Sequence, residues 1–215
     1  MEISSVNSTQ YPVLTVGHSN HPAETFINLL VRHGIDEVVD VRSAPYSRYT
    51  PHFNHEPLQR ALDDIGIAYT YLGGQLGGRP TDRSCYDCDG RVVYDRVAGT
   101  MQFDDGIRSV IRAADDRRVA LLCTEKEPLE CHRTLLVARA LAERDVAVCH
   151  ILADGGLESH DDAMSRLVDI HKLPPHGDMF RTRDDVTAEA LERQARKFAY
   201  VGEKPTAAKD EWAPA

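Results

Sequence analysis

A segment near the middle of the chain holds side chains of the kinds that enzymes use for catalysis. Cys131 and Arg133 follow a loop that contains Pro128, and Glu125 stands before that loop. If a helix begins near Cys131, its free amide groups and its dipole would favour a thiolate, and Arg133 in the first turn would help to hold an anion. Glu125 would face them across a cleft as a general acid or base. This spacing predicts a nucleophile, a proton carrier and an anion holder in one segment.

Two arginines and a histidine earlier in the chain could add charge and proton transfer. Arg42 and Arg48 belong to a stretch that also contains Tyr46 and Tyr49. In a loop, both guanidinium groups could clamp a phosphate or carboxylate, and the tyrosines would suit stacking on a nucleobase. His18 follows an apolar run and could act as a base, a metal ligand or a phosphate contact.

A glycine-rich turn at residues 73–78 ends in Gly77 and Gly78. It is not the phosphate loop of nucleotide hydrolases, because no Gly-Lys-Ser/Thr follows it. Glycines at such a turn indicate a close approach of the backbone, here one that could serve a ligand. The predicted substrate-binding set is Ser19, Arg42, Arg48, Gly77, Gly78 and Arg133.

Each of these side chains also has a purely structural interpretation. Cys131 could be a small buried filler, and Glu125 could be a solvated loop residue. His18 could form hydrogen bonds only within its own turn, and Arg42 could form an ion pair with Asp40 that braces the loop. The residue types and spacings alone leave both interpretations open.

The apolar pattern predicts the elements that position these groups. Short apolar runs, separated by amphipathic stretches, occupy residues 13–16, 37–41, 68–72, 119–123 and 146–152. This alternation predicts an α/β fold with an open, mainly parallel sheet and helices on both faces. Ligands of such sheets bind outside the carboxyl ends of the strands, where the candidate side chains all fall.

The polar character of the chain increases after its last apolar run. We predict a single α/β domain over residues 11–172, with a helix at 157–170. A polar C-terminal extension over residues 173–215 follows, in part helical near 186–198 and otherwise flexible.

The overall composition is that of an ordinary globular protein, with 42% hydrophobic and 27% charged residues among 215. The net charge of −9 opposes broad nucleic-acid binding, which needs a basic face, but permits a small anionic or nucleotide-like ligand. The polar first ten residues do not read as a signal peptide, and no apolar run reaches the ~18 residues of a membrane helix. We therefore expect a cytoplasmic protein with five reduced cysteines and no membrane partner.

Cys85 and Cys88 have a spacing that is common in zinc sites. A structural zinc site needs a second well-spaced pair, which the remaining cysteines do not supply. The pattern favours an exposed loop or an occasional thiol pair there, and the sequence requires no cofactor.

Several motifs occur in an order that resembles the domain-of-unknown-function family 488. They are TVGHSN, VVDVRSAPYSRYTPHFN, GIAYTYLGGQLGGRP, DGRVVYDRVAGTMQF, ALLCTEKEPLECHRTLLVARAL and HILADG. The resemblance runs from about Tyr11 to Gly155 and implies a compact α/β protein, without implying a settled activity. The family's motif residues fall here on Gly17, His18, Ser19, Asp40, Arg42, Pro45, Ser47, Arg48, Phe53, Leu76, Gly77, Gly78, Cys123, Glu125, Pro128, Cys131, His132 and Arg133. The family pattern does not include Cys85 and Cys88, which further weakens a zinc site there.

Three functions agree with these observations. The first is an enzyme for a phosphate- or nucleobase-containing substrate, with Glu125, Cys131 and His18 catalytic and the arginines holding the anion. The second is a metal-dependent hydrolase with His18, Glu125 and Cys131 as ligands. The third is a non-catalytic nucleotide- or nucleic-acid-binding module. A rhodanese-like or phosphatase-like site is disfavoured, because the spacing from Cys131 to Arg133 is too short for an oxyanion loop and the longer loop contains Pro128.

Overall fold

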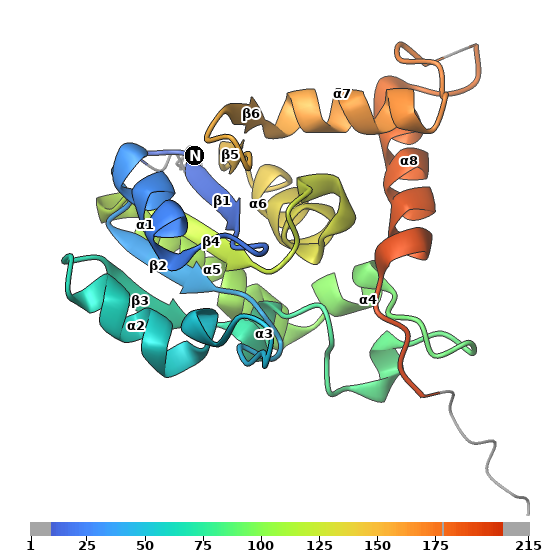
Figure 1. Ribbon diagram of the computed structural model, residues 1–215. Helices are drawn as coiled ribbons and strands as arrows, with labels where there is room; N and C mark the ends of the chain where they lie inside the picture. The colour runs from blue at the N-terminus through green and yellow to red at the C-terminus, as the bar shows by residue number, and fades with distance from the viewer. Residues whose placement is uncertain (1–9, 178, 204–215) are drawn as a thin grey trace, which may run out of the picture.

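A six-stranded sheet forms the centre of the computed structural model, which describes residues 10–177 and 179–203 (Figure 1). The strand order is β3-β2-β4-β1-β5-β6, and every pairing is parallel except that of β5 with β6. The predicted open, mainly parallel sheet is therefore confirmed. The strands are β1 (Val13–Gly17), β2 (Glu37–Asp40), β3 (Ala68–Tyr71), β4 (Val119–Cys123), β5 (Val148–Ile151) and β6 (Leu157–Ser159).

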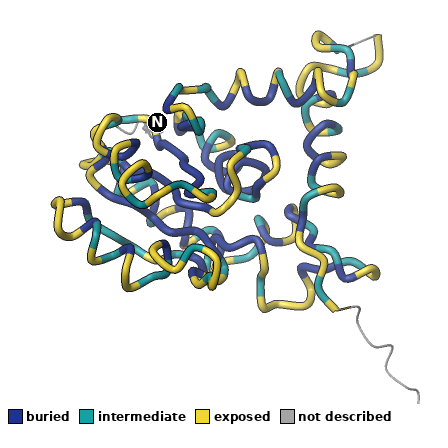
Figure 2. Tube along the Cα trace, in the orientation of Figure 1, coloured by how far each residue is buried: buried dark blue, intermediate teal, exposed yellow. Residues whose placement is uncertain are grey.

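Helices cover both faces of the sheet, because the central strands are apolar on both sides. On one face, α1 (Ala23–Arg32) and α2 (His55–Asp63) pack with Phe26, Leu30 and Leu62 against β1, β2 and β4. On the other face lie α5 (Met101–Asp116), the π-helical segment η4 (Arg133–Ala138) and α6 (Arg139–Ala142). Strands β1, β2 and β4 are buried along their whole length, and Figure 2 shows the buried stretches at the centre of the molecule.

The region after β5 differs from the single helix predicted at residues 157–170. Its first residues form the antiparallel edge strand β6, and α7 (His160–Ile170) begins only afterwards. The side chain of Ser159 accepts a hydrogen bond from the amide of Asp162, so it caps the helix at this later position.

The predicted C-terminal extension contains α8 (Arg183–Phe198), which begins three residues before the predicted 186. Thr182 and Asp185 form a capping box that fixes this start. The helix is not a detached tail, because Val186, Ala190 and Leu191 are buried in the same core cluster as α5 and η4. The end predicted to be frayed, from residue 204, lies outside the described residues.

Short helical segments occupy the chain between the main elements. The glycine turn itself folds as α3 (Gly73–Leu76), and the chain after it contains η2 (Arg83–Cys85) and α4 (Tyr94–Ala98). The remaining segments are η1 (Pro51–Phe53) and η3 (Pro128–Glu130). Among the described residues, no helix has both the length and the apolar character that crossing a bilayer requires.

Candidate active site

The carboxyl ends of β1, β2 and β4 meet at one edge of the sheet, as parallel pairing requires. Gly17 lies beside Cys123 in the register, and Asp40 lies beside Leu122. A pocket of about 370 Å³ opens at this edge. Its walls come from the loop after β2, the glycine turn, the loops on both sides of η3 and the chain around α8. This location agrees with the ligand sites of open α/β sheets.

The pocket contains only part of the predicted site. Of the predicted residues, it is lined by Arg42, Gly78, Glu125 and Cys131. The predicted residues outside its lining are His18, Ser19, Arg48, Gly77 and Arg133. Two further polar side chains complete its reactive wall: Cys123 and His132, which are among the family's motif residues but were not given a catalytic or substrate-binding role.

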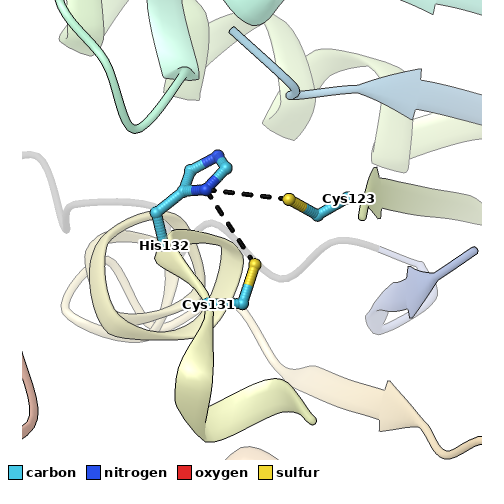
Figure 3. A group of neighbouring side chains, drawn as sticks. All are labelled: Cys123, Cys131 and His132. Carbon is cyan, nitrogen blue, oxygen red and sulfur yellow. Dashed lines mark hydrogen bonds between the residues drawn. The ribbon is translucent and has the colours of Figure 1, made fainter. Parts of the chain in front are cut away.

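Cys123, Glu125, Cys131 and His132 form a tight cluster beside the pocket. One carboxylate oxygen of Glu125 accepts hydrogen bonds from the thiols of Cys123, at 2.9 Å, and Cys131, at 3.0 Å. The Nδ1 atom of His132 lies 3.7 Å from the sulfur of Cys123 and 3.9 Å from that of Cys131 (Figure 3). We call these four residues the thiol cluster.

Neighbouring groups shift the pKa values within the thiol cluster. Burial raises the pKa of the Cys131 thiol well above its ordinary value, and contact with Cys123 raises it further. Burial would also raise the pKa of Glu125, but the thiol hydrogen bonds outweigh this effect and lower it. Burial lowers the pKa of His132, yet the neighbouring Cys131 and Glu125 raise it overall. Cys131 is therefore a neutral donor, and the helix-activated thiolate predicted there is not what the structure contains.

The ring of His132 is held in one orientation by backbone groups. Its Nε2 atom lies 3.0 Å from the carbonyl oxygen of Val41, so the ring donates its proton there and directs Nδ1 toward the sulfurs. Gly78 lies against the ring, and a Cβ at this position would come within 2.8 Å of His132 Cγ. The predicted close approach at the glycine turn is thus to the protein's own side chains, since Gly77 likewise abuts Ser43.

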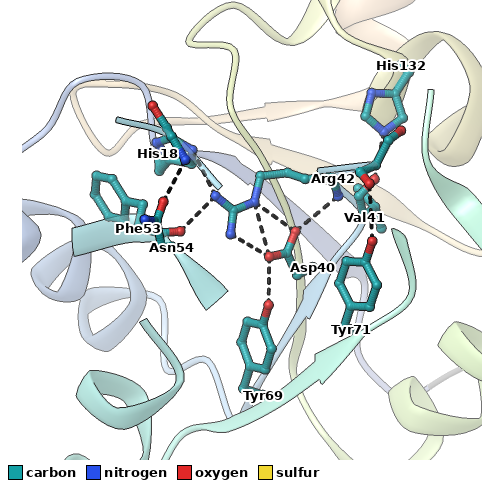
Figure 4. A network of polar contacts seen from close by, with 11 residues as sticks. His18, Asp40, Val41, Arg42, Phe53, Asn54, Tyr69, Tyr71 and His132 are labelled. Atoms are coloured by element: carbon teal, nitrogen blue, oxygen red, sulfur yellow. Dashed lines mark hydrogen bonds and ion pairs between the residues drawn. The ribbon is translucent and has the colours of Figure 1, made fainter. Parts of the chain in front are cut away.

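The predicted arginine clamp does not form, because Arg42 is occupied by an internal network (Figure 4). Its guanidinium forms an ion pair of 2.5 Å with Asp40, and both side chains are buried. The same group donates to the carbonyl oxygen of Phe53 at 2.9 Å and lies 3.2 Å from Nε2 of His18. Burial opposes the charge of Arg42, but Asp40 outweighs it and raises the pKa of Arg42. Tyr69 donates to the same Asp40 carboxylate at 2.7 Å.

His18 belongs to this network and not to the pocket wall. Its Nδ1 atom lies 2.8 Å from the carbonyl oxygen of Ser19, its Nε2 accepts from Arg42, and its ring stacks on Phe53. Burial and the nearby Arg42 charge lower the pKa of His18 to about 4. Because both ring nitrogens are engaged, the predicted metal set of His18, Glu125 and Cys131 is not assembled.

The other two arginines of the predicted clamp also have different positions. Arg133 is fully buried and donates to the backbone carbonyl oxygens of Glu125, at 2.5 Å, and Lys126, at 3.3 Å. It therefore fixes the loop that carries Glu125. Arg48 is on the exposed surface, where it donates to the hydroxyl of Tyr49 at 2.6 Å.

Comparison of the sequence with protein families finds one matching family model. Residues 22–140 match the family described as Domain of unknown function DUF488. The chain belongs to this family. No curated protein and no solved structure matches the chain.

The DUF488 match includes the whole thiol cluster, but part of the pocket wall lies beyond it. Phe198 and Tyr200, which follow residue 140, line the pocket together with Tyr94. Little in the sequence pointed to them, because Tyr94 lies in a stretch without clear periodicity and the others in a polar extension. The sequence contains clearer signals for Cys123 and His132. Cys123 ends an apolar strand, and His132 stands between Cys131 and Arg133.

Cys85 and Cys88 of this DUF488 protein differ in their exposure. Cys85 is buried and Cys88 is exposed, so the loop is not exposed throughout as predicted. All five cysteines are free. Within the described part of the chain, the group of thiol, imidazole and carboxylate ligands close enough for an ion is Cys123, Cys131 and His132.

Proposed function

We propose that this DUF488 protein is an enzyme that acts on a small nucleobase-containing substrate in the pocket, with Glu125 carrying the proton. The observation that carries the proposal is that one Glu125 oxygen accepts hydrogen bonds from two thiols at the wall of the pocket. A carboxylate in this position can accept a proton from a bound substrate and return it later.

The size and lining of the pocket support a planar substrate. Its volume of about 370 Å³ lies within the range of roughly 300–1,000 Å³ that is usual for small-molecule sites. Tyr46, Tyr94, Phe198 and Tyr200 contribute aromatic surface to the walls. Aromatic rings bind flat bases by stacking, with little dependence on the identity of the base.

Arg79, an exposed arginine at the pocket, could bind the anion in place of the predicted arginine clamp. Arg79 lines the pocket, and its guanidinium lies over the ring of Tyr200, 4.6 Å from the ring centre. A phosphate attached to the substrate would form an ion pair with the guanidinium of Arg79. The guanidinium of Arg42 is already paired with Asp40. We therefore assign phosphate contact to Arg79 and give Arg42 a structural role.

A substrate screen tests this function. The purified protein would be incubated with a panel of nucleobases, nucleosides and nucleotides, and mass spectrometry would identify products. We expect conversion of at least one compound that contains a nucleobase. Compounds that bind, as shown by a shift of the unfolding temperature, but are not converted would support the non-catalytic binding module and contradict the proposed enzyme.

A further inference from the structure

The sulfur and imidazole groups of the thiol cluster are arranged as a set of metal ligands. The two sulfurs and the Nδ1 atom of His132 all lie within 4.8 Å of one another. The measured sulfur–nitrogen separations are 3.7 Å from Cys123 and 3.9 Å from Cys131. A tetrahedral zinc ion, with Zn–S near ~2.3 Å and Zn–N near ~2.1 Å, would separate its sulfur and nitrogen ligands by about 3.6 Å. The two sulfur–nitrogen separations therefore differ from this value by only about 0.1 and 0.3 Å.

The imidazole is also oriented in the way that metal-binding histidines usually are. Such a ring donates its second N–H to a carboxylate or backbone carbonyl, which directs the other nitrogen at the ion. His132 donates from Nε2 to the carbonyl oxygen of Val41, and Nδ1 faces the sulfurs. Gly78 leaves room for the ring in this position. The ligand is thus held in place by backbone groups.

The surroundings distinguish this set from an accidental group of surface residues. Cys123 and Cys131 are 2% and 1% exposed; Cys123 is the last residue of β4, and Cys131 directly follows η3. All three residues nevertheless line the pocket. A site with three protein ligands and one side open to a pocket has the composition of catalytic zinc sites, in which water or substrate completes the coordination.

We propose that Cys123, Cys131 and His132 bind a zinc ion, with its fourth position facing the pocket and Glu125 beside it. Two thiolates and one imidazole favour zinc over the hard ions magnesium and calcium. Binding releases both thiol protons, so Glu125 loses the two donors that it has in this structure and becomes free to act on the water at the fourth position. A Cys₂His zinc site with an adjacent glutamate that is not a ligand is the chemical arrangement of hydrolytic nucleobase deaminases.

The zinc site goes beyond the proposed function and does not depend on it. A metal ion could bind to these ligands in a protein that converts no substrate, and Glu125 could carry a proton with no ion present. The tests are accordingly separate, because the metal site is measured by binding and the function by product formation.

Cobalt titration of the metal-free protein tests the site directly. After treatment with a chelator, the full chain would be titrated with Co²⁺, and absorption would report thiolate-to-cobalt charge transfer and tetrahedral geometry. We expect saturation at about one ion per chain and displacement of cobalt by zinc. Cys131→Ser and His132→Asn should each weaken binding by at least about 100-fold, because loss of a group that only hydrogen-bonds to a metal ligand already costs about 10–100-fold.

Matched variants separate ligand loss from general damage. Cys88→Ser and Cys149→Ser remove thiols outside the thiol cluster, and we expect both to bind cobalt like the wild type. Zinc should also protect Cys123 and Cys131 of the wild-type protein from alkylation, which mass spectrometry measures without any variant. Absence of a thiolate charge-transfer band, or equal alkylation with and without zinc, would overturn the proposal.

Discussion

At the scale of single residues, the candidate site depends on how closely backbone and side chains can approach each other. Gly78 is the clearest case, since a Cβ at this position would lie 2.8 Å from Cγ of the His132 ring. Gly74, in the same turn, has open space where a side chain would begin, with nothing within 4 Å of that point. The two glycines therefore have different physical roles, although they stand in one glycine-rich segment.

The variant Gly78→Ala should displace the ring of His132, because the added methyl group would lie 2.8 Å from Cγ. We expect a loss of roughly 1–3 kcal/mol in the free energy of unfolding, as for other overpacked sites, and zinc affinity about 10–100-fold weaker. Urea unfolding and cobalt titration measure these effects. Gly74→Ala is the matched control and should leave both nearly unchanged, so equal behaviour of the two variants would refute the assigned role of Gly78.

At the scale of elements, strand β5 and helix α7 are joined by a buried pair of histidines. His150 lies 2.9 Å from the hydroxyl of Thr15 and 3.2 Å from Nδ1 of His160. Burial, the neighbouring His160 and the charges of Arg133 and Arg166 lower the pKa of His150 to about 3. Burial lowers the pKa of His160 as well, while Asp161 opposes this shift. Both rings are therefore neutral in the folded protein at neutral pH.

These lowered pKa values predict a loss of stability in acid. The unfolded chain binds protons on histidine below pH ~6.5, whereas the folded chain resists protonation until the pH approaches the folded pKa, about 3 for His150. Stability is thus fully present above pH ~6.5 and decreases as the pH falls, by about 1.4 kcal/mol per pH unit for each neutral histidine.

Urea unfolding at pH 7 and pH 5 tests this linkage with the variant His160→Asn. Asparagine places a polar atom near the position of Nδ1 but does not titrate, so the variant should lose about 1–2 kcal/mol less than the wild type between the two pH values. His52→Asn, at an exposed position, is the control and should follow the wild type. The same loss in all three proteins would show that His160 does not contribute.

At the scale of the whole molecule, the sheet was predictable and much of the site was not. Each parallel strand is an apolar run between turn residues, so β4 was located correctly from Val119 to Cys123. Sequence cannot tell whether a guanidinium faces a ligand or a carbonyl oxygen, and Arg42 and Arg133 proved to hold the protein's own loops. Tyr200 could not be assigned to the pocket either, because the return of α8 to the core depends on tertiary packing.

The whole fold brings the thiol cluster, at the end of β4, into one pocket with aromatic residues from beyond α8. The central claim is that this pocket is catalytic and that Glu125 carries the proton. Kinetics of Glu125→Gln on a compound converted by the wild type test the claim most directly, with Glu192→Gln on the exposed face of α8 as the matched control. We predict a decrease in kcat of about 10²–10⁴-fold for Glu125→Gln with little change in KM, and no decrease for the control. Wild-type kcat in Glu125→Gln would contradict the claim.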